Sequence, residues 1–353
     1  MKKTLVALAV LAAGSAQAGI EIYNENKVTV NLKGDIEVVY KRGYEDNATT
    51  KQEIQDADFG FDVRYAINDD LQFGAYWEFD GSADNGLSGN AVKAGNTYVG
   101  VYSQAAGSLI VGRLDSMLDD AGIGSDYQFG LNSFFSNGSP FGADESIRYD
   151  IDKGNFYGGI AYKQDKNENA GLGEDGHMVD AKIGYRVADF DFTGFYGQAE
   201  FKGNANLADG MSDGDKETLY AIEGRWAGVE NLNLELGYYN MKMDPKTGES
   251  QTAQTYGFAA DYTLNQWVFA GGVSQVNLDK DNIVRTSATE TVNNDSETNW
   301  FVNAGYKVAP AATVYAEVGG SNGYSNKYGA ADGASKFYAQ NGVGFAVGAK
   351  AEF

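Results

Sequence analysis

The feature that most restricts the fold is a strict alternation of apolar and polar residues, which recurs in short segments along the chain. Apolar residues or glycine occupy every even position from Val28 to Tyr40, and polar residues occupy the odd positions from Thr29 to Glu37. Successive side chains of a β-strand point to opposite faces, so this pattern predicts a strand with one apolar and one polar face. After residue 18, no stretch approaches eighteen consecutive apolar residues, so the sequence predicts no membrane-spanning helix.

Sixteen such segments can be counted, and the connections between them sort by length. A soluble β-sandwich has no reason for such sorting, whereas outer-membrane barrels place short turns at one end and long loops at the other. We therefore predict an all-β fold, a 16-stranded antiparallel transmembrane β-barrel. The segments lie at 28–40, 55–66, 71–79, 95–104, 107–113, 145–151, 155–164, 177–187, 190–200, 216–226, 231–242, 252–263, 266–277, 298–308, 312–321 and 341–353, with short connections at 67–70, 105–106, 152–154, 188–189, 227–230, 264–265 and 309–311.

The first eighteen residues have the composition of a secretory signal peptide. Lys2 and Lys3 precede an apolar core, and the segment ends in the small-residue sequence Ala16-Gln17-Ala18. We expect cleavage before Gly19, which leaves residues 19–353 as a single barrel domain of an exported protein. The chain contains no cysteine, so neither a disulfide nor a thiolate metal site holds this domain together.

One long connection, at residues 114–144, differs from the others because it is rich in large apolar residues. About thirty residues without a strand pattern are too many for an ordinary connection, and Met117, Leu118, Tyr127 and Phe129 need a surface to pack on. We hypothesise that the segment folds into the barrel lumen and narrows it into an acidic pore; the alternative is a solvated surface loop. Its carboxylates are those of Asp115, Asp119, Asp120 and Asp126.

Charge and motifs exclude several classes of function. After removal of the first eighteen residues the chain has 25 basic and 49 acidic side chains, a net charge of −24, which repels nucleic acid. A single histidine, His177, and the absence of a G-x-S-x-G motif argue against an enzyme. Gly122 and Gly124 lack the third glycine of a dinucleotide fingerprint, so we expect no cofactor.

A metal site is not predicted, although two acidic stretches leave a possibility open. Residues 279–282 (DKDN) and 293–295 (NND) offer oxygen ligands that suit Ca²⁺ or Mg²⁺. The spacing of an EF-hand loop is missing from both. Divalent ions that bridge such acids to lipopolysaccharide phosphates are the remaining variant of this idea.

Four short stretches resemble the trimeric general porins of Gram-negative outer membranes. They are GIEIYNENKVTVNLKG at residue 19, SLIVGR at Ser108–Arg113, SIRYD at Ser146–Asp150 and the C-terminal GVGFAVGAKAEF that ends in Phe353. The resemblance implies a homotrimer in the outer membrane, in contact with lipid and lipopolysaccharide, whose third loop folds inward. It also implies a channel for passive diffusion of ions and small hydrophilic solutes. Phe353 would be the assembly signal read by the barrel-assembly machinery.

The same resemblance implies a ladder of basic residues on the pore wall that faces the loop acids. Arg113 matches one basic position, and Arg148 is a second arginine on the next strand. Two positions that are usually basic carry acids here, namely Asp35 and Asp58, and a third falls near Gly142. We therefore expect a more negative, cation-preferring constriction. The full expected wall consists of Asp35, Asp58, Asp62, Arg64, Glu78, Arg113 and Arg148.

Two other functions remain open at this point. A substrate-selective porin, for oligosaccharides or other small solutes, would use an aromatic slide built from Tyr127, Phe129, Phe134 and Phe135. A secreted β-rich adhesin or binding protein would have no pore, and it would extract in aqueous buffer without detergent.

Overall fold

A computed structural model describes residues 19–44, 48–81, 93–131, 139–203, 205–208, 211–278, 283–285, 291–293, 296–324 and 339–353. Residues 1–18, which carry the expected signal peptide, lie outside this range. The strands are β1 (Ile20–Glu25), β2 (Val28–Arg42), β3 (Lys51–Ala66), β4 (Leu71–Asp80), β5 (Lys93–Ser103), β6 (Gly107–Asp115), β7 (Gly142–Asp152), β8 (Phe156–Gln164), β9 (His177–Val187), β10 (Phe190–Glu200), β11 (Lys216–Val229), β12 (Leu232–Asp244), β13 (Gln251–Leu264), β14 (Trp267–Leu278), β15 (Ile283–Arg285), β16 (Thr291–Asn293), β17 (Ser296–Ala309), β18 (Ala312–Tyr324) and β19 (Ala339–Glu352).

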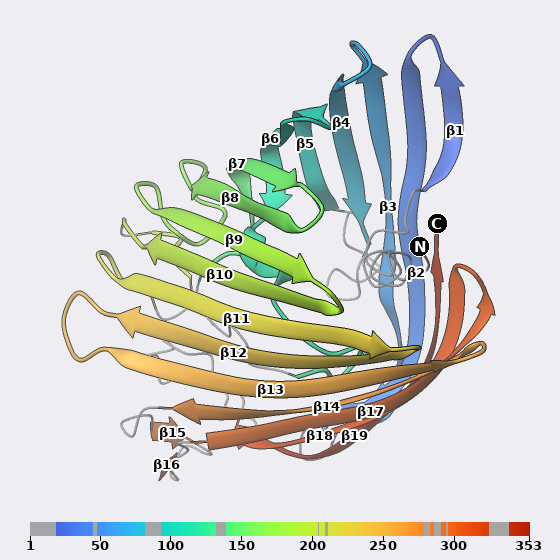
Figure 1. Cartoon of the computed structure of the whole chain (residues 1–353). Helices are drawn as coiled ribbons and strands as arrows, with labels where there is room; N and C mark the ends of the chain where they lie inside the picture. The colour runs from blue at the N-terminus through green and yellow to red at the C-terminus, as the bar shows by residue number, and fades with distance from the viewer. Residues whose placement is uncertain are drawn as a thin grey trace.

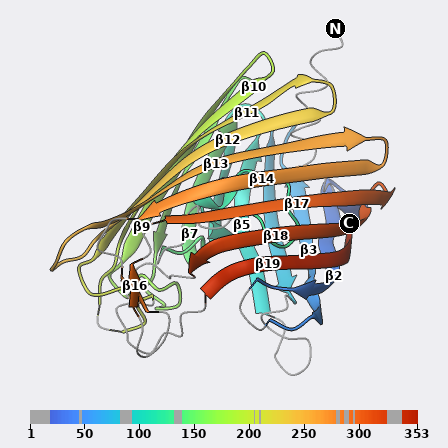
Figure 2. The ribbon, with the colours of Figure 1, turned by 90° about the horizontal axis from the view of Figure 1, so that it is seen from below.

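Sixteen strands form a closed antiparallel barrel. From β2 to β14 each strand pairs with its neighbours in the chain, β14 then pairs with β17, and β19 returns to pair with β2. Figures 1 and 2 show these strands following one another around the wall. The predicted 16-stranded barrel is confirmed. The prediction missed the small hairpin of β15 and β16, which forms a separate sheet, and the short strand β1.

Strand β1 and strand β19 share one edge of β2. β1 pairs with the first part of β2, from Ile20 opposite Leu32 to Glu25 opposite Val28. β19 pairs with the rest, and beyond its end Phe353 and Gly34 exchange two backbone N–H···O hydrogen bonds of 2.8 Å. β1 and β19 therefore lie end to end along the same edge of β2, and the two ends of the domain meet there.

The two faces of the wall differ as the alternation predicts. On β13, the outward Tyr256, Phe258 and Tyr262 are each more than 40% exposed, whereas the inward Thr255 and Ala259 are 1% exposed. An apolar belt of this size needs a cover other than water. None of the helical segments in the described ranges is long and apolar enough to cross a membrane.

Aromatic residues line the edge of this apolar belt that lies farther from the short turns. Tyr196, Tyr220, Tyr238 and Tyr256 occupy outward positions on the adjacent strands β10 to β13. The rings of Tyr220 and Tyr238 lie 6.1 Å apart, and those of Tyr238 and Tyr256 lie 5.1 Å apart. Such a row is typical of the level at which a barrel meets the interface between lipid and water.

The junction between Phe353 and Gly34 generates a prediction. Deletion of Phe353 removes two backbone hydrogen bonds, each worth about 1 kcal/mol. Phe353→Ala keeps both bonds and loses only the ring. We expect the deletion to lower the midpoint of heat-induced unfolding below that of Phe353→Ala, as measured by electrophoretic mobility of the folded barrel. Equal midpoints would show that the junction does not contribute to stability.

Candidate functional site

The connection between β6 and β7 folds into the barrel. Its neck is closed by a 2.5 Å hydrogen bond from the Ser116 backbone N–H to the Phe141 carbonyl. It begins with the 3₁₀ helix η2 (Met117–Asp120), whose N-cap Ser116 accepts from the Leu118 N–H through its hydroxyl. Along this segment, backbone N–H groups donate hydrogen bonds to inward side chains of β9, β11, β12 and β18. We refer to the described residues 116–131 and 139–141 as the inner loop.

A single buried carboxylate, that of Glu317 on β18, holds the far part of the inner loop. Three consecutive backbone N–H groups, those of Tyr127, Gln128 and Phe129, donate to it at 2.6, 3.0 and 2.6 Å. Successive N–H groups that converge in this way form an anion-binding concavity, and hydrogen bonds to a charged acceptor are stronger than neutral ones. Glu317 is 1% exposed, so these bonds are shielded from water.

Further carboxylates of the wall receive the inner loop along its length. The Met117 N–H donates to Asp180 at 2.5 Å. The Gly122 N–H donates to Glu223 at 2.6 Å, and the Gly124 N–H donates to Glu235 at 2.7 Å. At the two remaining points, Ser139 donates to Glu217 from its N–H and hydroxyl at 3.0 and 2.6 Å, and the Gln128 amide donates to Glu37 at 2.7 Å.

The sequence analysis did not identify these wall carboxylates. The alternation places Glu37 on the polar face of its strand, but nothing in the pattern shows which loop atom it meets. We call Glu37, Asp180, Glu217, Glu223, Glu235 and Glu317 the anchoring carboxylates.

Glycines of the wall make room for the apolar side chains of the inner loop. A Cβ atom added at Gly344 would lie 2.6 Å from the Phe129 ring, and one added at Gly197 would lie 2.6 Å from the Leu118 side chain. Both distances are shorter than real contacts, so a larger residue at either position would displace the loop side chain. The loop side chains thereby enter two buried clusters, one with Leu118 among residues of β9 to β13 and one with Phe129 among residues of β13 to β19 and β2.

Between the inner loop and the short turns, the barrel contains a partly open cavity of about 1230 Å³. Asp120, Ser125 and Tyr127 bound it on the loop side, and it extends to the short turns, among them Asp69 and Asp70. The rest of its lining is rich in hydroxyl, amide and charged groups from β4 to β17. A water-accessible lumen narrowed by a firmly anchored loop is therefore the candidate functional site.

Comparison with known proteins decides the family. A family model described as "Gram-negative porin" matches residues 4–326. The chain belongs to the Gram-negative porin family. Porin-like protein H of Photobacterium profundum is 27% identical over 340 residues, which cover 93% of this chain and 97% of that protein. The monosaccharide porin of a Halomonas species is 24% identical, covering 90% and 94%.

A solved structure agrees on the fold. The trimer form of OmpT, an outer membrane protein of Vibrio cholerae, superposes with a TM-score of 0.72 at 18% identity, covering 93% of this chain and all of that chain. This porin is accordingly an outer-membrane barrel, and lipid covers the apolar belt on its outward face.

The four predicted loop acids divide into two pairs. Asp115 is the last residue of β6 and accepts from the Asn96 side-chain amide at 2.5 Å. Asp120 forms an ion pair with Lys182 on β9 and lies 3.7 Å from the Arg148 guanidinium. Asp119 and Asp126 are exposed, and neither forms an ion pair with another described residue of the porin.

Enclosure by the barrel raises the pKa values of Asp119 and Asp126. Burial among protein atoms raises the pKa of Asp119 from 3.8 to about 6, and the neighbouring carboxylates of Asp115 and Asp120 add to the shift. Burial also raises the pKa of Asp126 from 3.8 to about 6, with a further contribution from Glu317. Both side chains are exposed to solvent although protein atoms surround them, so each is ionised at neutral pH and protonated in mild acid.

Most of the predicted wall residues point into the lumen, in opposed charge pairs. Asp62 lies 3.1 Å from the Lys33 ammonium and 2.5 Å from the Arg64 guanidinium. Asp35 lies 3.1 Å from the Lys350 ammonium. The inward-facing residues are Asp35, Asp58, Asp62, Arg64, Glu78 and Arg148, with Asp58 accepting from the Gly81 N–H at 2.9 Å and Glu78 from the Asn96 N–H at 2.7 Å.

Arg113 does not lie on the pore wall, where the resemblance had placed it. It pairs across with Thr97 on the face that carries the exposed Val99 and Val111, so it points outward. Its guanidinium lies 2.7 Å from the Asp144 carboxylate. The register between β6 and β7 shifts just after Gly112, whose φ is 141°, and this irregularity is invisible in the resemblance that suggested a wall position.

Other predicted residues have different outcomes. Phe129 is only 6% exposed, so its ring is not available to a solute in the lumen. The Tyr127 ring stacks on the Tyr315 ring, with 4.0 Å between the ring centroids. Phe134 and Phe135 lie outside the described residues, as do the acidic stretch 279–282 and residues 294–295.

The anchoring carboxylates generate a prediction. In Glu317→Gln an amide replaces a carboxylate that receives three N–H groups, and we expect a loss of about 2 kcal/mol because bonds to a charged acceptor weaken. The loosened loop should increase current fluctuations of the open channel in a planar bilayer. Glu297→Gln is the matched control, because Glu297 is also buried on the inner wall and accepts from Ser321 of the wall itself. Equal fluctuations in both variants would contradict the anchoring role.

Proposed function

We propose that this porin is a passive diffusion channel for ions and small hydrophilic solutes, with a preference for cations. The observation that carries the proposal is an imbalance of unpaired charge beside the narrowed lumen. Asp119 and Asp126 are ionised at neutral pH and have no ion-pair partner among the described residues. Lys307 lines the cavity without an ion pair among the described residues, whereas a basic side chain on each of β2, β3, β7, β9, β11 and β19 is paired with an acid of the wall or loop.

Each pairing involves an acid close to its cation. Arg64 lies 2.5 Å from Asp62, and Arg148 binds Asp150 through two hydrogen bonds of 2.8 and 2.9 Å. Arg225 lies 2.8 Å from Glu223, and Lys182 pairs with Asp120. Paired cations add little to the field that a passing ion meets. One unpaired carboxylate about 8 Å from an ion contributes roughly 0.5 kcal/mol in water, so two favour a cation by about 1 kcal/mol, or about fivefold.

A second candidate function is selective uptake of a small uncharged solute such as a monosaccharide. The Halomonas relative is named a monosaccharide porin, and the cavity here is lined by hydroxyl and amide groups that suit hydroxylated solutes. Tyr102 and Tyr157 stand at its side, stacked with Arg64 and Arg186 at 3.5 and 4.0 Å. Saturable reduction of ion current by a monosaccharide at micromolar concentration would favour this function over general diffusion.

We propose a homotrimer as the working assembly. The support is membership of the porin family together with the trimer form of the structurally similar Vibrio cholerae protein. Lipopolysaccharide as a neighbour, and recognition of Phe353 by the barrel-assembly machinery, belong to the same proposal. The pore-free binding protein considered from the sequence is set aside, because the chain belongs to the porin family.

The unpaired carboxylates generate a selectivity prediction. Asp119→Asn combined with Asp126→Asn should lower the cation-to-anion permeability ratio about fivefold, since two nearby charges are lost. The measurement is the reversal potential in a planar bilayer under a salt gradient. Asp175→Asn is the control, because Asp175 is exposed on an outer loop and paired with Lys166 at 2.7 Å. An unchanged reversal potential in the double variant would remove both acids from the conduction path.

The raised pKa values of about 6 generate a pH prediction. Acidification from pH 7.5 to pH 5 protonates Asp119 and Asp126, so negative charge is lost and the cation preference of the wild type should fall. In the double variant these groups are absent, and the same acidification should change the reversal potential much less. A wild-type reversal potential that stays constant across this range would contradict the assignment.

A further inference from the structure

Lys163 and Asp180 form an ion pair that is completely buried inside the barrel. Lys163 lies on β8 and Asp180 on β9, with 2.6 Å between the ammonium nitrogen and a carboxylate oxygen. Both side chains are 0% exposed, so neither touches a solute in the lumen. A cation and an acid that cannot reach the conduction path act on it only through other residues.

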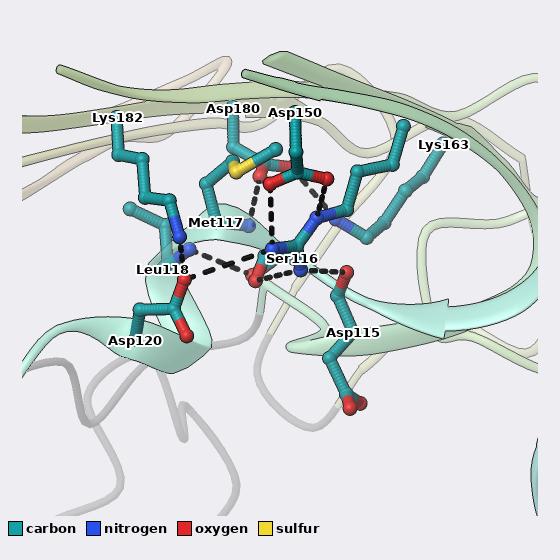
Figure 3. A network of polar contacts seen from close by, with 10 residues as sticks. Asp115, Ser116, Met117, Leu118, Asp120, Asp150, Lys163, Asp180 and Lys182 are labelled. Carbon is teal, nitrogen blue, oxygen red and sulfur yellow. Dashed lines mark hydrogen bonds and ion pairs between the residues drawn. The ribbon is translucent and has the colours of Figure 1, made fainter. Parts of the chain in front are cut away.

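The residue reached by this pair is Met117. The second carboxylate oxygen of Asp180 accepts the Met117 backbone N–H at 2.5 Å, and Met117 is the first residue of η2. The Met117 side chain is also fully buried and rests over Gly159 of β8. Figure 3 shows Lys163, Asp180 and Met117 joined in one network at the base of the inner loop.

Other charged groups surround the pair. Arg148 of β7 donates to the backbone carbonyls of Asp115 and Ser116 at 3.3 and 3.4 Å, so it also holds the loop base. The neighbouring charges are those of Arg148 and Asp150 on β7, Asp115 on β6, Asp119 and Asp120 on η2, and Lys182 on β9. We call Arg148, Asp150, Lys163, Asp180, Lys182 and Asp120 the clasp; its three cations and three acids cancel.

Removal of one partner from a buried ion pair has a predictable effect. The remaining charge has lost its counter-charge and stays away from water, which is strongly destabilising. A lone buried carboxylate is therefore tolerated better when it is protonated, and a lone buried amine is tolerated better when it is neutral. Loss of the lysine is therefore more destabilising at high pH, and loss of the aspartate is more destabilising at low pH.

We propose that Lys163 is a positioning residue of the channel, which holds the Asp180 carboxylate ready to receive the Met117 N–H and so fixes the base of the inner loop. The proposal rests on the proposed channel function, because the loop sets the bore through which solutes pass. It also gives the basic residues of this wall a different role from an ion-selective ladder. Within the clasp they hold the loop, while selectivity is left to Asp119 and Asp126.

The test uses two single variants over pH 5 to 9. In Lys163→Met the lone Asp180 becomes charged as the pH rises, so open-channel current fluctuations should increase several-fold toward pH 9, relative to wild type at the same pH. In Asp180→Asn the amide oxygen still accepts the Met117 N–H, and the lone Lys163 becomes charged as the pH falls. Its fluctuations should increase several-fold toward pH 5. Comparison with wild type at each pH removes the common effect of Asp119 and Asp126.

The double variant Lys163→Met with Asp180→Asn contains no titratable group at this position and serves as the control. Its fluctuations should differ from wild type by the same factor at every pH. The midpoint of heat-induced unfolding provides a second readout with the same opposite signs, and it remains interpretable if the wild type does not conduct. Single variants as quiet as wild type throughout, or an increase that does not depend on pH, would overturn the proposal.

Discussion

The constriction depends on one kind of contact, in which a buried carboxylate of the barrel wall receives backbone N–H groups of the inner loop. A segment inside a barrel has no ladder of its own, yet its buried polar groups need partners. Glu317 meets this need for three consecutive residues, and Asp180, Glu223 and Glu235 meet it elsewhere. Because each bond is charge-assisted and directional, the loop has a defined path without regular secondary structure.

Glycine and carboxylate act together in this arrangement. Where the wall has a carboxylate it binds the loop backbone, and where it has glycine it admits a loop side chain, as Gly197 admits Leu118 and Gly344 admits Phe129. The apolar clusters that result lie inside a pore that is otherwise wet. Acidic residues therefore do two different jobs in one lumen. Some are anchors shielded from solvent, and others, such as Asp119, are exposed to it.

The strands could be predicted from the sequence because a period of two reports directly which face each residue occupies. That logic gave the inward positions of Asp62 and Glu78, and the composition of residues 114–144 pointed to an inward loop. The resemblance, and not the alternation, misplaced Arg113, which lies on the outward face with Val111. The alternation could not find Glu317 or Lys163, because parity defines a face but not the partner that arrives there from 190 or 17 positions away.

The shared edge of β2 has a consequence for how such a chain is made. Because β1 and β19 occupy successive parts of that edge, the first and the last strand of the domain meet at a single seam. Synthesis proceeds from the N-terminus, so the residues that complete the ring are the last to emerge. Until then the part of β2 that β1 does not cover presents an open edge, and an open edge pairs with other strands. A chain that stops early cannot hide this edge, which distinguishes an unfinished molecule from a finished one.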